Sequence, residues 1–290
     1  MFYMPYMVQK NPPKAVLSNN KQLKLQTMTL FKNRIAFSLL LLLFINCVTG
    51  QSDSIGGTYL QSADEFRKNA QPDSAFVYYE KAAVEFLKND NFERCVHAYN
   101  QMGVIRTRQD KYGEAKIHLE KALSIGLSKL DSDNLTLATT YINLGVNYAA
   151  EEDYPQSLWY HNKALSIRRL KSGKYNADVA TSYGNIGNVY FRSKDYHNAI
   201  TAHKNALQIR EKIFGKTGLE VIQSHINLGN AYKEKRDYKN ALKYYQKALE
   251  IKILQVGEGH KDLAKFYQNV SDVYYLMGDK TQGDYYKAKY

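Results

Sequence analysis

Two histidines are the side chains of this chain best suited to bind a metal ion. His161 and His203 lie 42 residues apart and fill the same slot in successive copies of a recurring sequence, where other copies have Leu119 and Tyr245. Zinc holds its histidine nitrogens at about 2 Å, whereas equivalent positions in stacked helix pairs lie roughly 10 Å apart. Two rings so far apart could not share one ion. The spacing therefore predicts packing or surface residues and no metal site.

Other reactive side chains show no catalytic pattern. Cys47 and Cys95 lack the spacing of paired metal ligands, and the sequence has no glycine-rich loop of the Walker or dinucleotide type. Glu151 and Glu152 fall in a polar turn, where solvation explains a pair of acids. We expect no catalytic residue and no cofactor, and a packing role for Cys95. An enzyme is the least favoured class.

Asparagine is the polar residue that recurs. It stands at the centre of the phrase Tyr141-Ile142-Asn143-Leu144-Gly145, whose copies follow at residues 183–187, 225–229 and 267–271, with a looser copy at 99–103. The step between copies is 42 residues, and a period of roughly 20 to 50 residues indicates a stacked-repeat protein. Such an array presents a long surface rather than a closed catalytic pocket. The repeat therefore favours a binding function.

Each repeat is predicted to form two helices, which we name A and B. Helix A shows the spacing of one helical face at Tyr141, Leu144, Gly145 and Tyr148, and helix B does so over residues 158–167. The turn between them ends in an aspartate that can cap helix B, which stabilises a helix by about 1 kcal/mol. These residues are Asp153, Asp195, Asp237 and Asp279. The glycines within helix A predict close approach of a neighbouring helix. They are Gly145, Gly187 and Gly229.

Six such units align within residues 51–290, which we expect to form one solenoid. They span 56–94 (divergent), 95–136, 137–178, 179–220, 221–262 and 263–290 (incomplete). A solenoid normally closes with a polar capping helix, because its last unit otherwise exposes an apolar face. We therefore expect either a partner over this end or a truncated gene product.

The order of small and aromatic residues resembles the tetratricopeptide repeat (TPR). The copy that shows it best has Leu228, Gly229, Tyr232, Ala241, Tyr245 and Ala248. The usual TPR period is about 34 residues, so this chain has eight extra residues per unit, which we place after helix B. That longer form is similar to the kinesin-light-chain type, although Lys261 stands where that type has proline. The resemblance implies an all-α, right-handed superhelical solenoid of antiparallel helix pairs. A HEAT or armadillo array is the alternative.

The resemblance also implies where a partner binds. In TPR proteins helix A lines a concave groove, and the family's groove positions fall here on asparagines and two basic residues. They are Asn143, Asn185, Asn188, Asn227, Asn230, Asn269, Arg192 and Lys233. Side-chain amides can both donate to and accept from an extended peptide backbone. The alternative is that these amides bond within or between helices. The family's clamp for a peptide carboxylate is not matched, because one of its positions holds Ile142, Gly184, Ile226 and Gln268.

The basic charge is concentrated at the start of the chain. The net charge is +12, but residues 1–50 hold six Lys or Arg and no acid, which leaves +6 on the remaining 240 residues. Charges of both signs are interleaved there, as on a solvated helical surface. Nucleic acid is therefore not the expected partner.

Residues 28–50 have the pattern of a signal peptide. Lys32 and Arg34 precede the apolar run 35–45, and small and polar residues follow. As a helix this run would rise about 16 Å, short of the ~30 Å hydrocarbon layer. We expect export to the periplasm or the medium, with membrane anchoring by an uncleaved leader or by a lipid at Cys47 as the alternatives. Residues 1–27 are then a mis-annotated upstream extension.

The sequence supports two functional hypotheses. The first is a non-catalytic scaffold that binds a peptide or protein partner in the groove of the array. The second is the sensor or regulatory part of a larger signalling system, because long-period TPR arrays often precede histidine kinases and CHAT-type peptidases.

Overall fold

A computed structural model describes residues 55–290 of the chain. The chain divides into two units, residues 1–55 and 56–290. The expected upstream extension, the signal peptide and the lipid attachment at Cys47 lie outside the described residues. No helix within residues 55–290 is both long and apolar enough to cross a bilayer.

The described residues form helices joined by short turns, and no strand occurs among them. Residues 55–68 are helical. The following helices are α2 (Pro72–Lys88), α3 (Phe92–Arg108), α4 (Tyr112–Lys129), α5 (Leu135–Ala150), α6 (Tyr154–Ser172), α7 (Ala177–Arg192), α8 (Tyr196–Phe214), α9 (Leu219–Glu234), α10 (Tyr238–Val256), the 3-10 turn η1 (Lys261–Leu263), α11 (Ala264–Leu276) and α12 (Lys280–Lys287).

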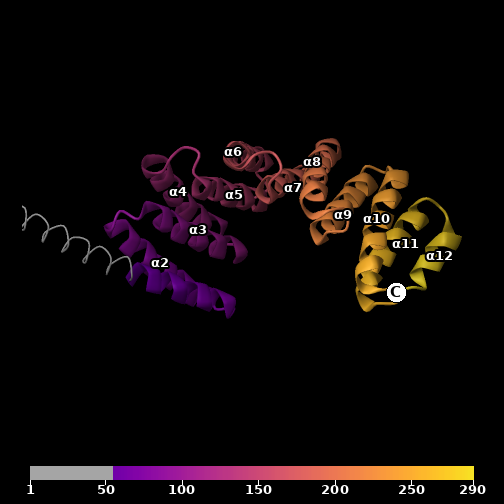
Figure 1. Ribbon diagram of the computed structural model, residues 1–290, viewed down its shortest axis with the longest axis horizontal. Helices are drawn as coiled ribbons and strands as arrows, with labels where there is room; N and C mark the ends of the chain where they lie inside the picture. The colour runs from indigo at the N-terminus through magenta and orange to yellow at the C-terminus, as the bar shows by residue number, and fades with distance from the viewer. Residues whose placement is uncertain (1–54) are drawn as a thin grey trace, which may run out of the picture. The chain divides into compact units, whose positions relative to one another are not determined.

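The helices pack in chain order (Figure 1). The odd-numbered helices from α3 to α11 are the A helices, and each packs against the B helix that follows it. Each B helix also packs against the A helix of the next unit, and α3 contacts α5 directly. The prediction of an all-α solenoid of antiparallel helix pairs is confirmed.

The A helices begin slightly before the unit boundaries expected from the sequence. Helices α5 and α7 start at Leu135 and Ala177, two residues ahead of the expected positions 137 and 179. The side chains of Asn134 and Asn176 cap them by accepting hydrogen bonds from the backbone two residues on, at 2.7 Å in both cases. An asparagine cap therefore sets the start of these helices, ahead of their first buried residue.

The prediction that the eight extra residues follow helix B is wrong. They lengthen that helix, since residues 166–170 lie inside α6, and α6, α8 and α10 each have 19 residues. The run contains no glycine or proline that would stop a helix. The helix ends only at a glycine with positive φ, which is 75° at Gly173 and 73° at Gly215.

The expected aspartate caps are confirmed. The backbone amide three residues later donates to the side chains of Asp153 and Asp195 at 3.1 Å, of Asp237 at 3.2 Å and of Asp279 at 3.0 Å. The residue before each cap is in the left-handed region, as at Lys194 with a φ of 63°. Each A–B turn thus reverses the chain within a few residues and places helix B beside helix A.

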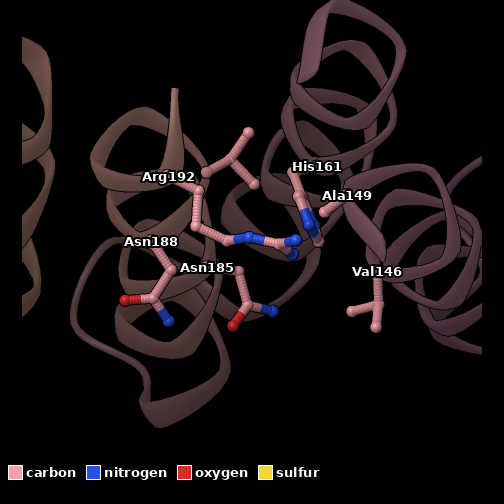
Figure 2. A pocket seen from close by; sticks show the side chains of 7 residues that line it. Val146, Ala149, His161, Asn185, Asn188 and Arg192 are labelled. Carbon is pink, nitrogen blue, oxygen red and sulfur yellow. The ribbon is translucent and has the colours of Figure 1, made fainter. Parts of the chain in front are cut away.

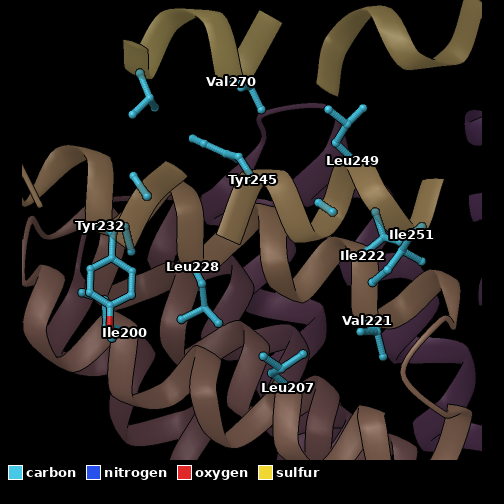
Figure 3. Close-up of a cluster of buried hydrophobic side chains, with 14 of the residues drawn as sticks. Ile200, Leu207, Val221, Ile222, Leu228, Tyr232, Tyr245, Leu249, Ile251 and Val270 are labelled. Atoms are coloured by element: carbon cyan, nitrogen blue, oxygen red, sulfur yellow. The ribbon is translucent and has the colours of Figure 1, made fainter. Parts of the chain in front are cut away.

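Close helix approach at the helix A glycines is also confirmed. A Cβ atom added at Gly145, Gly187 or Gly229 would lie 2.6–2.8 Å from ring atoms of His161, His203 or Tyr245, respectively. Around Tyr245 the core is continuous across units: Leu228 of α9, Leu249 of α10 and Val270 of α11 are buried with it (Figure 3). The ring in each B helix therefore occupies the space that the glycine in helix A leaves.

Successive units are joined by a repeated arginine–serine contact. Arg168 of α6 donates to the Ser182 hydroxyl of α7 at 3.1 Å, and Arg210 of α8 donates to the Ser224 hydroxyl of α9 at 2.7 Å. Both serines are buried. The contact satisfies a buried polar group at each of these two junctions.

Candidate functional site

The predicted groove residues all lie on A helices. Asn143 is on α5, Asn185, Asn188 and Arg192 are on α7, Asn227, Asn230 and Lys233 are on α9, and Asn269 is on α11. Asn188 and Arg192 are exposed, and the other six are half-buried. Because they recur at equivalent positions, they follow one side of successive A helices.

The amides of these asparagines differ in their hydrogen bonds. Asn230 accepts a hydrogen bond from the Tyr245 hydroxyl at 2.5 Å, and Asn227 accepts one from Gln223 Nε2 at 2.9 Å. Four others make no hydrogen bond within residues 55–290: Asn143, Asn185, Asn188 and Asn269. Bonding among the described residues therefore accounts for two of the six amides and leaves four available to a partner.

Three predicted residues meet at a pocket of about 240 Å³ between α5, α6 and α7 (Figure 2). They are Asn185, Asn188 and Arg192. Val146, Ala149 and Val189 form apolar parts of its wall, and His161 of α6 completes it. The pocket thus combines the A helices of two consecutive units with the B helix between them.

His161 lies deep in this pocket. Its side chain is 1% exposed, and its Nδ1 has no hydrogen-bond partner among the described residues. Burial, with a smaller contribution from the Arg168 charge, lowers the pKa of His161 to about 4. The ring is therefore neutral at physiological pH and has one N–H to donate.

Arg192 supplies the positive charge of the pocket. Figure 2 shows its side chain running across the pocket toward the His161 ring. Its guanidinium carbon lies 5.8 Å from the centre of the Tyr154 ring, and it makes no ion pair within residues 55–290. Arg168, by contrast, is engaged inside a junction between units. The charge of Arg192 is thus available to a ligand.

One wall residue of the pocket, Ala149, is smaller than its counterparts in the next two units. Ala149 stands where the next two units have Phe191 and Lys233, and His161 stands where a later unit has Tyr245. Phe191 packs against Tyr196 with ring centres 5.7 Å apart. Sequence analysis did not single out Ala149 or His161 as site residues. The signal that could have found them is the small residue in a column of larger ones.

The remaining predicted residues do not join this pocket. Asn143, Asn227, Asn230, Asn269 and Lys233 line none of its wall. They belong to the neighbouring stretches of the same row of A helices, so the eight predicted residues form an extended row rather than one cluster.

The packing roles expected for His161, His203 and Cys95 are confirmed. Both histidines are buried against a glycine. The Cys95 thiol is buried and donates to the Ala83 carbonyl at 3.5 Å, and burial raises its pKa to about 11. Within residues 55–290, no group of three or more His, Cys, Asp or Glu side chains could hold a metal ion.

Comparison with known proteins identifies the repeat. A family model described as tetratricopeptide repeat matches residues 94–169 and 178–253, which together make up more than half of the chain. The chain belongs to the tetratricopeptide repeat family. TPR arrays are typically non-catalytic scaffolds for protein interaction. A search among curated proteins finds no match.

Solved structures place this TPR array near the kinesin-light-chain type. It is similar to BtubC (BKLC) from P. vanneervenii, with 19% identity and a TM-score of 0.61 over 82% of this chain and 89% of that one. A putative kinesin light chain with TPR-like repeats from Podosopora anserina matches with 14% identity and a TM-score of 0.61, over 71% and 98% of the two chains. A STAND protein with a TPR sensor from Pyrococcus horikoshii matches with 15% identity and a TM-score of 0.61, over 84% of this chain and 42% of that one. The long-period type expected from the sequence is confirmed.

Proposed function

We propose that this TPR protein is a non-catalytic scaffold that binds an extended segment of a protein partner along its A helices. The observation that carries the proposal is the row of amides that make no hydrogen bond to another described residue, Asn143, Asn185, Asn188 and Asn269. Asparagine is a poor residue inside a helix, so a repeated one needs a reason. Unbonded amides on a row of A helices can donate to and accept from a peptide backbone in many sequence contexts.

A peptide-display selection tests this proposal. The full-length chain is the bait for a library of random twelve-residue peptides, and affinities of the selected peptides are then measured. Replacing Asn143, Asn185 and Asn269 together by alanine should weaken binding at least tenfold. The circular dichroism melt should stay nearly unchanged, because no hydrogen bond within residues 55–290 is lost.

Gln208→Ala is the matched control, because Gln208 is an exposed polar residue on the B helix α8. It should bind the selected peptides as the unchanged chain does. Unchanged binding by the triple variant contradicts the proposal. A large drop in its melting temperature would instead mark the amides as structural.

A second candidate function is the sensor or regulatory part of a larger signalling system. What supports it is the similarity to a TPR sensor within the much longer Pyrococcus horikoshii protein.

A further inference from the structure

The pocket between α5, α6 and α7 has one positive side chain and no negative one in its wall. Arg192 offers a guanidinium, Asn185 and Asn188 offer amide groups, and no acidic side chain lines the wall. Guanidinium N–H groups only donate, and two of them match the two oxygens of a carboxylate. The site therefore has a positive charge that no acidic side chain of its wall balances.

His161 points to the same missing partner. It is buried to 99% of its surface, lines the pocket, and has a ring nitrogen without a hydrogen bond among the described residues. A buried polar group normally has a partner. Because the ring is neutral, it does not repel the nearby guanidinium of Arg192.

The equivalent positions in later units lack this combination of a small residue and an arginine. In the next unit Phe191 replaces Ala149 and Glu234 replaces Arg192, which adds bulk and reverses the charge. In the unit after that, Leu276 stands in the arginine position. Donor groups and free volume thus coincide at α5–α7, which marks one position along the row of A helices.

We propose that this pocket receives the carboxylate of an aspartate or glutamate side chain from the extended partner segment. The inference rests on the proposed binding function and adds a specificity subsite to it. A side chain is favoured over a chain terminus because the unbonded amides continue on both sides, at Asn143 on α5 and at Asn269 on α11. A bound segment would pass across the pocket and not end in it.

The site differs from the family's carboxylate clamp. One clamp position falls on Gly184 in α7, which has no side chain to offer. The subsite is instead made by the small Ala149 and by Arg192 at the end of α7. The proposed subsite thus depends on residues that differ from those at the same positions in the neighbouring units.

The test uses the full-length chain and the display selection with peptides whose C-termini are amidated. The selected peptides should carry Asp or Glu at one fixed position, and changing that residue to Asn or Gln should weaken binding at least tenfold. Arg192→Gln removes the charge from an exposed position and should abolish the acidic preference. Ala149→Phe copies the residue of the next unit and should do the same by filling the pocket.

Glu234→Gln is the control, since it changes charge at the equivalent exposed position one unit later and should leave the preference intact. Peptides selected without an acidic preference, or a preference that survives Arg192→Gln, would overturn the subsite and leave the scaffold function standing. Selection only from a library with free C-termini would assign the pocket to a terminal carboxylate and also overturn the side-chain version. If neither library yields a peptide, both proposals fall.

Discussion

Gly184 and Gly187 lie three residues apart in α7, yet a methyl group added at each would meet different surroundings. At Gly187 the new Cβ would lie 2.6 Å from the His203 ring, whereas at Gly184 the nearest atom is the Nη2 of Arg210 at 3.5 Å. The first distance forces a shift of a buried ring, and the second is an ordinary contact. The two glycines therefore serve different purposes despite their shared helix.

We predict opposite effects of alanine at these two positions. Gly187→Ala should lower stability by about 1–3 kcal/mol, as overpacking of a core does. Gly184→Ala should raise it by roughly 0.5–1 kcal/mol, because alanine favours the helix. Urea unfolding followed by circular dichroism measures both. A Gly187→Ala variant at least as stable as the unchanged chain would contradict the assigned role of Gly187.

The asparagines show how much of the candidate site could be predicted from the sequence. The positions of the asparagines follow from the repeat, but their partners do not. Asn230 is bonded because Tyr245, fifteen residues on, reaches it, whereas Asn188 has His203 at the corresponding distance and makes no bond within the described residues. The ring in helix B of the same unit therefore decides whether the amide in helix A is available, and this contact is known only from the packed geometry.

At the scale of the elements, the A–B turn between α7 and α8 combines strain with a cap. Lys194 has a φ of 63°, a conformation that costs a non-glycine residue roughly 1–2 kcal/mol. The next residue, Asp195, accepts hydrogen bonds from both the backbone and the side chain of Asn198, at 3.1 and 2.7 Å. The cap and the packing of both helices hold the turn in this form.

Substitutions in this turn should separate the two contributions. Lys194→Gly is expected to stabilise the chain by up to about 1 kcal/mol, because glycine adopts positive φ without steric cost. Asp195→Ala should destabilise it by about 1 kcal/mol through loss of the cap. Thermal melts of the two variants provide the measurement. A destabilised Lys194→Gly variant would show that the lysine side chain has a role of its own.

The elements themselves were largely predictable, because apolar spacing recurs along the array and an aspartate caps the B helices α6, α8, α10 and α12. The length of helix B was not predicted correctly. Comparison with the usual, shorter TPR period placed residues 166–170 after the helix, whereas they lie inside α6. Local composition was the better guide: nothing in that run stops a helix before Gly173. The asparagine caps at Asn134 and Asn176 were likewise visible in the sequence but were not used.

For the molecule as a whole, buried histidines couple stability to pH. Burial lowers the pKa of His161 and His203 to about 4, from 6.5 in an exposed histidine. Between these values the unfolded chain binds more protons than the folded one, so the free energy of unfolding falls as the pH drops from 6.5 toward 4. Above pH 6.5 both rings are neutral in the folded and in the unfolded chain, so they cause no loss of stability there. Each ring contributes up to about 3 kcal/mol to this loss.

Replacing both rings by leucine, the residue of the same slot at position 119, should flatten this dependence. Urea midpoints of the full-length chain at pH 7.5 and 4.5, followed by the fluorescence of its single tryptophan, Trp159, provide the comparison. The difference between the two midpoints should be smaller in the double variant than in the unchanged chain. An equal difference would mean that other groups, such as His97, His118 and His225, whose pKa values burial also lowers, govern the acid sensitivity.

The contact of Arg168 with Ser182 recurs as Arg210 with Ser224, so two successive junctions have the same chemistry. Excision of residues 179–220 would bring Arg168 opposite Ser224, and duplication of those residues would create a third junction of the same kind. The chain can therefore be shortened or extended by whole units without any new complementary surface having to arise. Gene duplication alone would therefore give a longer chain whose units already have matching junctions. The same 42-residue register could be used in protein engineering to move the α5–α7 pocket along the array.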